Sequence, residues 1–192
     1  LKGTNNNRPN IKKHINVDGL NVFYWNTQSI TNKLDYISVL TNDVNADVVC
    51  VVEHWLSSQE LSVVNIPGYY LVSSYCRPKH GLHGGSAIFV KENIIVNQPI
   101  DLSNIVLQNI FEASCIFIPE LNAFCISLYL TSGFSRSNFD IFLNRLYDLL
   151  SAIFSFKNNA NIIFAADFNV DFLTPSKDLE DILNLFYSFG LY

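Results

Sequence analysis

A long apolar run that ends abruptly in polar residues is the most informative pattern along the chain. Residues 162–166 are all apolar, and this run predicts a strand buried on both faces. Asp167, Phe168 and Asn169 follow it. Residues two positions apart on an extended chain point to the same face, so we expect Asp167 and Asn169 to share a site. An Asp167 that only caps the following turn would give the same pattern.

The remaining apolar patterns predict an α+β fold. Alternating or continuous apolar residues predict strands over 20–25, 47–52, 69–75, 85–91, 110–118 and 123–130. Helical spacing predicts helices over 31–42 with Thr31 as N-cap, from Ser137 onward, and over 176–187. We assign the apolar stripe of the second helix, Phe139 to Ile153, to the core. Too few helices separate the strands for a doubly wound parallel sheet, so we expect mixed or antiparallel sheets packed together with helices outside.

Composition places the chain among globular proteins of one domain. Hydrophobic residues make up 49% and charged residues 15% of the 192 residues. Residues 1–13 hold four basic residues and no acidic one, so we expect 1–17 to form a mobile basic arm and 18–192 the folded domain. The other residues carry all 17 acidic side chains. The excess of acidic side chains in the folded domain argues against tight non-specific DNA binding and suits a carboxylate site for divalent cations.

The cysteines indicate a reducing compartment. Cys50, Cys76, Cys115 and Cys125 show no Cys-x-x-Cys spacing, and three of them lie in apolar runs, so we expect free thiols. The polar leader does not resemble a signal peptide, and no apolar run reaches membrane length. We therefore expect a soluble intracellular protein. Because the chain starts at Leu1 and contains no Met, we expect a fragment or a processed piece.

Polar side chains stand where several predicted strands leave the core. Asn26 ends the first strand, Glu53 follows the strand 47–52, and Tyr129 lies near the end of 123–130. With Asp167 and Asn169 they make a set of carboxylate, carboxamide and phenol groups. Converging strand ends are where sites on sheet scaffolds form, so we expect these five residues to form one site.

The motifs around these residues resemble those of a known family. The chain contains, in the family's order and rough spacing, Val22–Asn26, Val49–Leu56, Gly84–Val90, Ser127–Tyr129 and Ala166–Asn169. As a set they resemble the endonuclease/exonuclease/phosphatase (deoxyribonuclease I-like) family, most of all the apurinic-type endonuclease domain of non-LTR (LINE-like) retrotransposons. The resemblance covers residues 18–192. It implies a four-layer α/β/β/α sandwich of two mixed β-sheets flanked by helices, and metal-dependent hydrolysis of phosphate esters.

The resemblance also implies a role for each of the five residues. Glu53 would hold Mg²⁺, with Mn²⁺ as an alternative, and Asn26 would help to position the metal or the phosphate. Tyr129 would hydrogen-bond the scissile phosphate, Asp167 would orient the attacking water, and Asn169 would donate to the phosphoryl oxygens. These residue types suit phosphoryl transfer, which needs a divalent cation, donors aimed at the developing charge and an orienting group for water.

The sequence departs from the family pattern at several positions. Gln28 stands where many relatives have a second acidic metal ligand, and Leu130 and Ser132 stand where the retrotransposon group has Arg and Pro. Ala166 replaces a Gly, which would shift Asp167 if that position required a Gly-only backbone conformation. The family's Ser-Asp-His element, with its acid/base His, does not occur before Tyr192, so we expect a domain that lacks its C-terminal strands.

The turn-rich loop 77–83 is the candidate DNA-facing surface. Arg77, Lys79 and Arg136 would contact phosphates there, and Tyr75 would stack on a base. An ordinary solvated hairpin loop fits the same residues. His54 is expected to have a supporting or surface role, and we disfavour a metal role for the histidines of the loop because no partner ligands are evident.

Three functional hypotheses remain open. The preferred one is a monomeric Mg²⁺-dependent DNA endonuclease of a non-LTR retrotransposon, without a membrane partner and nuclear if it is a retrotransposon product. The second is a phosphatase acting on small phosphoesters or phosphoinositides, although no basic cluster of the kind that inositol phosphates need is evident. The third is a catalytically incomplete transposon remnant that lacks its acid/base His.

Overall fold

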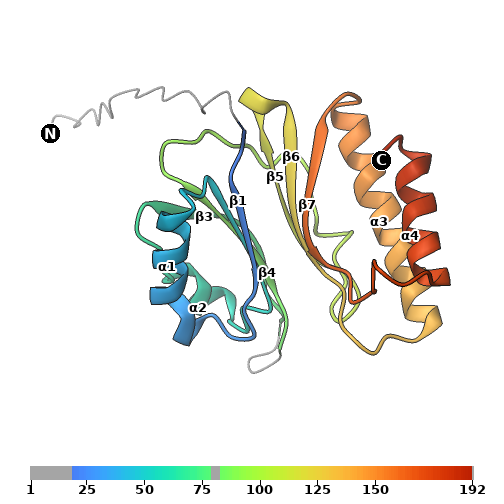
Figure 1. Ribbon diagram of the computed structural model, residues 1–192, viewed down its shortest axis with the longest axis horizontal. Helices are drawn as coiled ribbons and strands as arrows, with labels where there is room; N and C mark the ends of the chain where they lie inside the picture. The colour runs from blue at the N-terminus through green and yellow to red at the C-terminus, as the bar shows by residue number, and fades with distance from the viewer. Residues whose placement is uncertain (1–18, 79–82, 192) are drawn as a thin grey trace, which may run out of the picture.

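A computed structural model describes residues 19–78 and 83–191 (Figure 1). The expected basic arm, residues 1–17, and Lys79 lie outside the described residues. Of the helices within those ranges, none is both long and apolar enough to cross a bilayer.

The first sheet has four strands in the order β1-β2-β4-β3. These strands are β1 (Val22–Asn26), β2 (Val48–Val52), β3 (Tyr69–Tyr75) and β4 (Ser86–Lys91). β1 runs parallel to β2, whereas β4 runs antiparallel to both β2 and β3. β2 lies in the interior of this sheet and all its residues are buried, as its unbroken apolar run predicts.

The second sheet has three strands in the order β5-β6-β7. β5 (Glu112–Ile118) and β6 (Ala123–Tyr129) form an antiparallel hairpin, joined by the short 3₁₀ turn η2 (Pro119–Leu121). β7 (Asn161–Asp167) pairs in parallel with β6. Both sheets therefore contain parallel and antiparallel pairs, which confirms the expectation of two mixed sheets.

Helices cover the outer face of each sheet (Figure 1). The 3₁₀ turn η1 (Thr31–Lys33), α1 (Leu34–Asp43) and the short α2 (Ser58–Ser62) lie beside the first sheet, whereas α3 (Arg136–Phe156) and α4 (Lys177–Ser188) lie beside the second. The four-layer α/β/β/α sandwich expected from the sequence is thus confirmed.

Three apolar clusters hold these layers together. The cluster between the sheets includes Val48, Cys50, Ile88, Ile116 and Cys125. The Sγ atoms of Cys50 and Cys125 lie 3.7 Å apart across this interface, and all four cysteines are free thiols, as expected. Outer clusters pack each sheet against its helices. The α3 stripe is core, as predicted, because its buried residues are Phe139, Phe142, Leu146, Leu149, Leu150 and Ile153.

The structure corrects two helix starts. Thr31 does not cap the first helix, because it lies inside η1 and no side chain caps that turn or α1. α3 begins at Arg136 rather than Ser137, since the Ser135 hydroxyl accepts a hydrogen bond from the Asn138 N–H.

The strand that leads to Asp167 also differs from its prediction. Within the described part of the chain β7 pairs only with β6, and Ala165 is its only buried residue. Both faces of 162–166 are covered, as predicted, but most of these residues are only partly buried. The apolar run reflects contact with the other sheet on one face and with the helices on the other, along the edge of a sheet.

Candidate active site

The ends of four strands meet at one edge of the sandwich. The β1–β2 register places Asn26 opposite Val52, the residue before Glu53, and the β6–β7 register places Tyr129 opposite Asp167. The side-chain Nδ2 of Asn26 donates to Glu53 Oε1 and to Asp167 Oδ2, at 2.8 Å each. One carboxamide therefore joins the two carboxylates across the sheets. The structure brings these strand ends together as the sequence suggested.

A cavity of about 520 Å³ opens beside this bridge. It is lined by Tyr24, Asn26, Ala166, Asp167, Phe168, Asn169, Val170 and Phe172. One part of the lining is polar and contains the Asn26 amide and the Asp167 carboxylate. The other part is aromatic. The cavity is large enough for a small polar group such as a phosphate, held between a carboxylate side and an apolar side.

The turn that follows β7 departs from the extended chain expected there. Asn169 adopts a left-handed backbone conformation with φ 48°, and its N–H donates to Asp167 Oδ1 at 3.0 Å. The Asn169 side chain donates to the Leu130 carbonyl after β6. Asp167 therefore caps the turn with one carboxylate oxygen and reaches Asn26 with the other. Asp167 is therefore both a cap of the turn and a part of the shared site, the two interpretations that the sequence left open. The prediction that Asp167 and Asn169 point to the same face of an extended chain is wrong.

Glu53 is held in a constrained position. It has a φ of 54°, an uncommon left-handed conformation for a non-glycine residue, and Trp55 has a φ of 61°. The Glu53 N–H donates to the Gly85 carbonyl at 2.8 Å, and the Trp55 N–H donates to the Gly84 carbonyl at 3.0 Å. Trp55 Nε1 donates to Glu53 Oε2 at 3.2 Å. Both oxygens of this largely buried carboxylate are thus oriented.

Two phenols stand next to the carboxylates. Burial, followed by the charge of Glu53, raises the pKa of Tyr129 well above its ordinary value. Burial, followed by the charge of Asp167, does the same for the pKa of Tyr24. Both groups therefore remain protonated at neutral pH and can act as hydrogen-bond donors.

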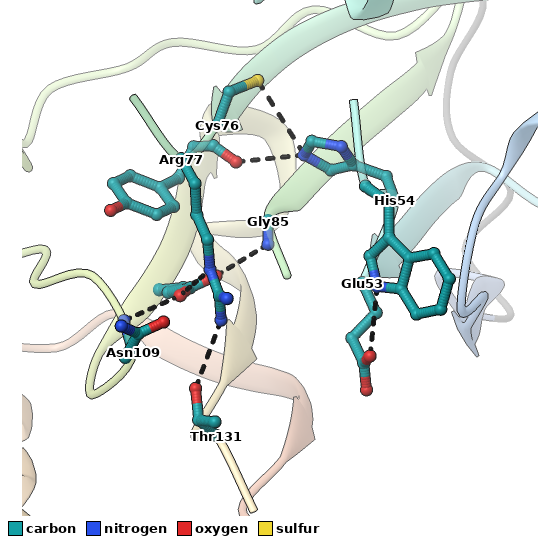
Figure 2. A network of polar contacts seen from close by, with 10 residues as sticks. Glu53, His54, Cys76, Arg77, Gly85, Asn109 and Thr131 are labelled. Carbon is teal, nitrogen blue, oxygen red and sulfur yellow. Dashed lines mark hydrogen bonds and ion pairs between the residues drawn. The ribbon is translucent and has the colours of Figure 1, made fainter. Parts of the chain in front are cut away.

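The Arg77 side chain is largely buried and points toward Thr131 rather than out to solvent (Figure 2). Its Nε donates to Glu112 Oε1 at 2.7 Å in an ion pair whose side chains are 9% and 0% exposed, and its Nη2 reaches the Thr131 hydroxyl. Glu112 also accepts from the backbone N–H groups of Gly85 and Asn109, at 2.7 and 2.9 Å. The expectation of a solvent-facing Arg77 is wrong because a carboxylate far along the sequence neutralises it.

Arg136 also forms ion pairs with acidic side chains of the protein. Its guanidinium pairs with Asp140 on its own helix and with Asp178 and Asp181 on α4, at 2.6–2.8 Å. It therefore joins α3 to α4 instead of forming part of the cavity lining. Its expected phosphate contact is not supported by this position.

His54 is a buried structural residue (Figure 2). Its Nδ1 lies 3.0 Å from the Leu56 N–H and its Nε2 lies 3.0 Å from the Tyr75 carbonyl. Because a backbone N–H can only donate, Nδ1 accepts and Nε2 carries the proton, so the ring is neutral. Burial lowers the pKa of His54 to about 4. The supporting role expected for His54 is consistent with this arrangement.

The departure at Ala166 does not disturb the site. Ala166 lies inside β7, pairs with Leu128 and is not among the residues with positive φ. The position therefore requires no glycine, and Asp167 follows a regular strand. Gln28, by contrast, has a φ of 41° in the turn that follows β1.

Sequence reasoning missed two aromatic residues near the carboxylates. Tyr24 lines the cavity, and its signal was its position two residues before Asn26 on the same strand face. Trp55 stacks on His83 with ring centroids 3.8 Å apart, directly beside Glu53. No sequence pattern indicated that stack, since the two residues come from different loops.

The oxygen atoms of the site fit a divalent cation. Asn26 Oδ1 is buried and has no hydrogen-bond partner among the described residues, and it lies on the carboxamide that contacts Glu53 and Asp167. Carboxylate and amide oxygens are hard ligands of the kind that Mg²⁺ takes, and Mg²⁺ commonly binds through only one or two carboxylates. Within residues 19–78 and 83–191, no group of three or more His, Cys, Asp or Glu side chains is arranged to hold a metal.

A family model described as the endonuclease/exonuclease/phosphatase family matches residues 23–179, which include all five strand-end residues. The chain belongs to this family. Family membership indicates hydrolysis of phosphate esters, generally with a divalent metal. It confirms the resemblance that the motifs suggested.

Solved structures share the fold of this endonuclease/exonuclease/phosphatase chain at low sequence identity. An AP endonuclease from Leishmania major is similar with a TM-score of 0.68 and 14% identity, covering 88% of this chain and 66% of that one. The endonuclease domain of TRAS1, a telomere-specific non-LTR retrotransposon, is similar with a TM-score of 0.65 and 13% identity, covering 91% and 72%. A Neisseria 3′ phosphatase bound to a product DNA hairpin is similar with a TM-score of 0.62 and 13% identity, covering 88% and 71%.

The family member described here spans about two thirds of the length of these structures. No curated protein sequence matches it at a significant level.

Proposed function

We propose that this chain carries the catalytic residues of a Mg²⁺-dependent DNA endonuclease of the kind found in non-LTR retrotransposons. The observation that supports this most is the Asn26 carboxamide, which joins Glu53 and Asp167 at 2.8 Å each beside a cavity. The similar fold of the TRAS1 endonuclease domain supports the retrotransposon assignment. As a retrotransposon product, the protein would act on DNA in the nucleus, as a monomer.

Each residue has a place in phosphodiester hydrolysis. Glu53 and the carboxamide oxygen of Asn26 would hold Mg²⁺, which neutralises charge on the phosphate oxygens. Asp167 can accept a proton from an attacking water and orient it toward the phosphorus. The protonated Tyr129 phenol and the Asn169 amide can donate to phosphoryl oxygens as charge develops. The carboxylates would thus bind the metal and orient the water, and the neutral phenol and amide groups would donate hydrogen bonds to the phosphate.

DNA is the substrate that the comparisons favour. The Leishmania and TRAS1 proteins are named as endonucleases, and the Neisseria phosphatase binds a DNA hairpin. The two arginines expected to face DNA are paired with carboxylates. We therefore expect DNA binding to depend on the divalent cation more than on arginine contacts.

Nicking of supercoiled plasmid tests the proposal. With Mg²⁺ the unsubstituted protein should convert plasmid to open circles, and EDTA should abolish the conversion. Glu53→Ala and Asp167→Ala should each lower the rate at least ~100-fold, because each removes a group that acts on metal or water. Asp171→Ala is the matched control, since the hydrogen bonds of Asp171 within the described residues go to Leu173 and Thr174 in its own exposed turn. Equal nicking by all four proteins would refute the proposal.

The same preparations separate the two other hypotheses. Release of phosphate from a small phosphoester, without nicking of DNA, would identify a phosphatase. Stabilisation of the protein by Mg²⁺, without hydrolysis of either substrate, would identify a catalytically incomplete member of the family.

A further inference from the structure

Two buried polar atoms in the cavity lack hydrogen-bond partners. Four buried side-chain atoms in the described part of the chain make no hydrogen bond, and two of them, the Tyr24 hydroxyl and Asn26 Oδ1, belong to residues that line this one cavity. Tyr24 and Asn26 stand two residues apart on β1 and so point to the same face of the sheet. An unsatisfied buried polar group destabilises a fold, so two in one place indicate a site built for a ligand.

Two tyrosines of β3 provide a comparison, because their hydroxyls are hydrogen-bonded to backbone carbonyls. The Tyr69 hydroxyl donates to the Ala46 carbonyl at 2.7 Å, and the Tyr70 hydroxyl donates to the Ile94 carbonyl at 3.1 Å. Tyr24 has a comparable position in a strand, and its ring packs in the cluster between the sheets. Of these three hydroxyls, that of Tyr24 has no hydrogen-bond partner among the described residues, and Tyr24 lines the cavity.

The chemistry of the lining defines the ligand group. The Tyr24 hydroxyl needs an acceptor, whereas Asn26 Oδ1 needs a cation or a donor. A phosphate ester with its bound divalent cation supplies both in one ligand. The cavity of about 520 Å³ is also much larger than the space of about 30 Å³ that one water takes.

We infer that Tyr24 is a substrate-binding residue, whose hydroxyl donates a hydrogen bond to a phosphoryl oxygen in the cavity beside Asp167. This inference rests on the proposed function, because it assumes that a phosphate ester binds at the strand ends. It assigns to β1 a substrate contact in addition to the proposed metal ligand Asn26. It also gives the unpaired hydroxyl a partner in the substrate complex.

Orthophosphate binding in the presence of Mg²⁺ tests the assignment directly. Isothermal titration calorimetry should show that Tyr24→Phe binds orthophosphate about 10-fold more weakly, the loss of one hydrogen bond to a charged group. The same change should leave the thermal midpoint equal or higher, since it removes an unpaired buried hydroxyl and keeps the ring. If Tyr24 had only a structural role, its substitution would not weaken phosphate binding while the stability of the protein stayed the same.

Tyr69→Phe is the matched control, because it removes a hydroxyl that is already paired. It should lower the thermal midpoint and leave orthophosphate affinity unchanged, the reverse of Tyr24→Phe. Equal phosphate affinity for Tyr24→Phe and the unsubstituted protein would mean that the hydroxyl binds only water, and would overturn the inference. Absence of any orthophosphate binding by the unsubstituted protein would overturn it as well.

The outcome is separate from that of the endonuclease proposal. Tyr24-dependent phosphate binding without plasmid nicking would refute the endonuclease and leave the Tyr24 assignment standing. Nicking at the same rate and with the same phosphate affinity in Tyr24→Phe would refute only the assignment.

Discussion

The Arg77 guanidinium and the Glu112 carboxylate form a 2.7 Å ion pair in which the Glu112 side chain is completely shielded from water. Glu112 belongs to β5 of the second sheet, opposite Tyr129 in β6. Its other oxygen accepts from the Gly85 N–H, and the Gly85 carbonyl in turn accepts from the Glu53 N–H. The pair therefore links the strand pair β5–β6 of one sheet, through Gly85, to the backbone of Glu53, which follows a strand of the other.

Glu112→Gln should destabilise the protein by about 3 kcal/mol, because it leaves the buried Arg77 charge without its partner. The free energy of unfolding in urea measures this loss. Arg145→Ala is a suitable control, since the ion pair of Arg145 with Asp148 is exposed and spans 3.5 Å. Removal of that pair should cost less than about 1 kcal/mol. Similar losses for the two variants would show that Arg77 regains solvent or another partner.

The double change Arg77→Met with Glu112→Leu should remain destabilised by at least about 2 kcal/mol. Replacement of a buried ion pair by apolar residues is often neutral, but here the N–H groups of Gly85 and Asn109 also lose their acceptor. Urea unfolding again provides the measurement. Full recovery of stability in the double variant would mean that Glu112 serves only to neutralise Arg77.

Gly85→Ala should destabilise the protein by more than about 2 kcal/mol. A Cβ there would lie 2.3 Å from His54 Nε2, and the backbone has a φ of +93°, which side chains rarely adopt. Gly133→Ala is the control, because Gly133 has a φ of +69° but open space around it. It should cost only about 1 kcal/mol. Thermal unfolding compares the two, and equal losses would argue against the contact with His54.

Acid should destabilise the fold through His54. The pKa of His54 is about 4 in the folded chain, below its ordinary value of 6.5, so the unfolded chain takes up the proton first as the pH falls. The stabilisation is complete above pH 6.5 and is lost as the pH falls toward 4, a change of about 3 kcal/mol. The NMR signals of the His54 ring should show a neutral imidazole at pH 5.5. Titration near 6.5 would contradict this prediction.

Asn26→Asp should make stability depend on a divalent cation. The change replaces the N–H₂ group that donates to Glu53 and Asp167 with an oxygen, so three carboxylates then face one another. We expect a loss of about 2 kcal/mol in EDTA, and a larger recovery with Mg²⁺ than the unsubstituted protein shows. Thermal midpoints in EDTA and in Mg²⁺ measure both effects. An equal response to Mg²⁺ in the two proteins would argue against a cation near residue 26.

The positions of four of the five candidate residues could be predicted because they depend on local patterns. Asn26, Glu53, Tyr129 and Asp167 each stand where an apolar strand ends, and parallel pairing of β1 with β2 and of β6 with β7 brings those ends together. The family motifs that contain these residues then indicated a role for each of them in the hydrolysis of phosphate esters. The position of Tyr24 beside Asn26 also follows from the local strand pattern. However, a tyrosine in a strand rich in aromatic residues gives no sign in the sequence that its hydroxyl is unpaired.

The errors came from partners that are distant in sequence or from backbone conformation. Nothing near Arg77 in the sequence shows that Glu112 will neutralise it, and the acidic residues of α4 that pair with Arg136 are equally remote. The left-handed turn at Asn169 depends on a hydrogen bond from its own N–H to Asp167, which competes with an extended chain. The five-residue α2 was not predicted because its main signal is the capping box of Ser57 and Glu60 rather than an apolar stripe.

The pairing of Tyr129 with Asp167 has a consequence for changes in chain length. Side chains alternate between the two faces of a strand, so one residue inserted into β7 before Asp167 would turn the carboxylate away from Asn26. The same insertion between Phe156 and Asn161, where the chain passes from α3 to β7, would leave the alternation intact. Relatives of this chain should therefore differ in length between these elements, while the spacing along each strand up to its polar end stays constant.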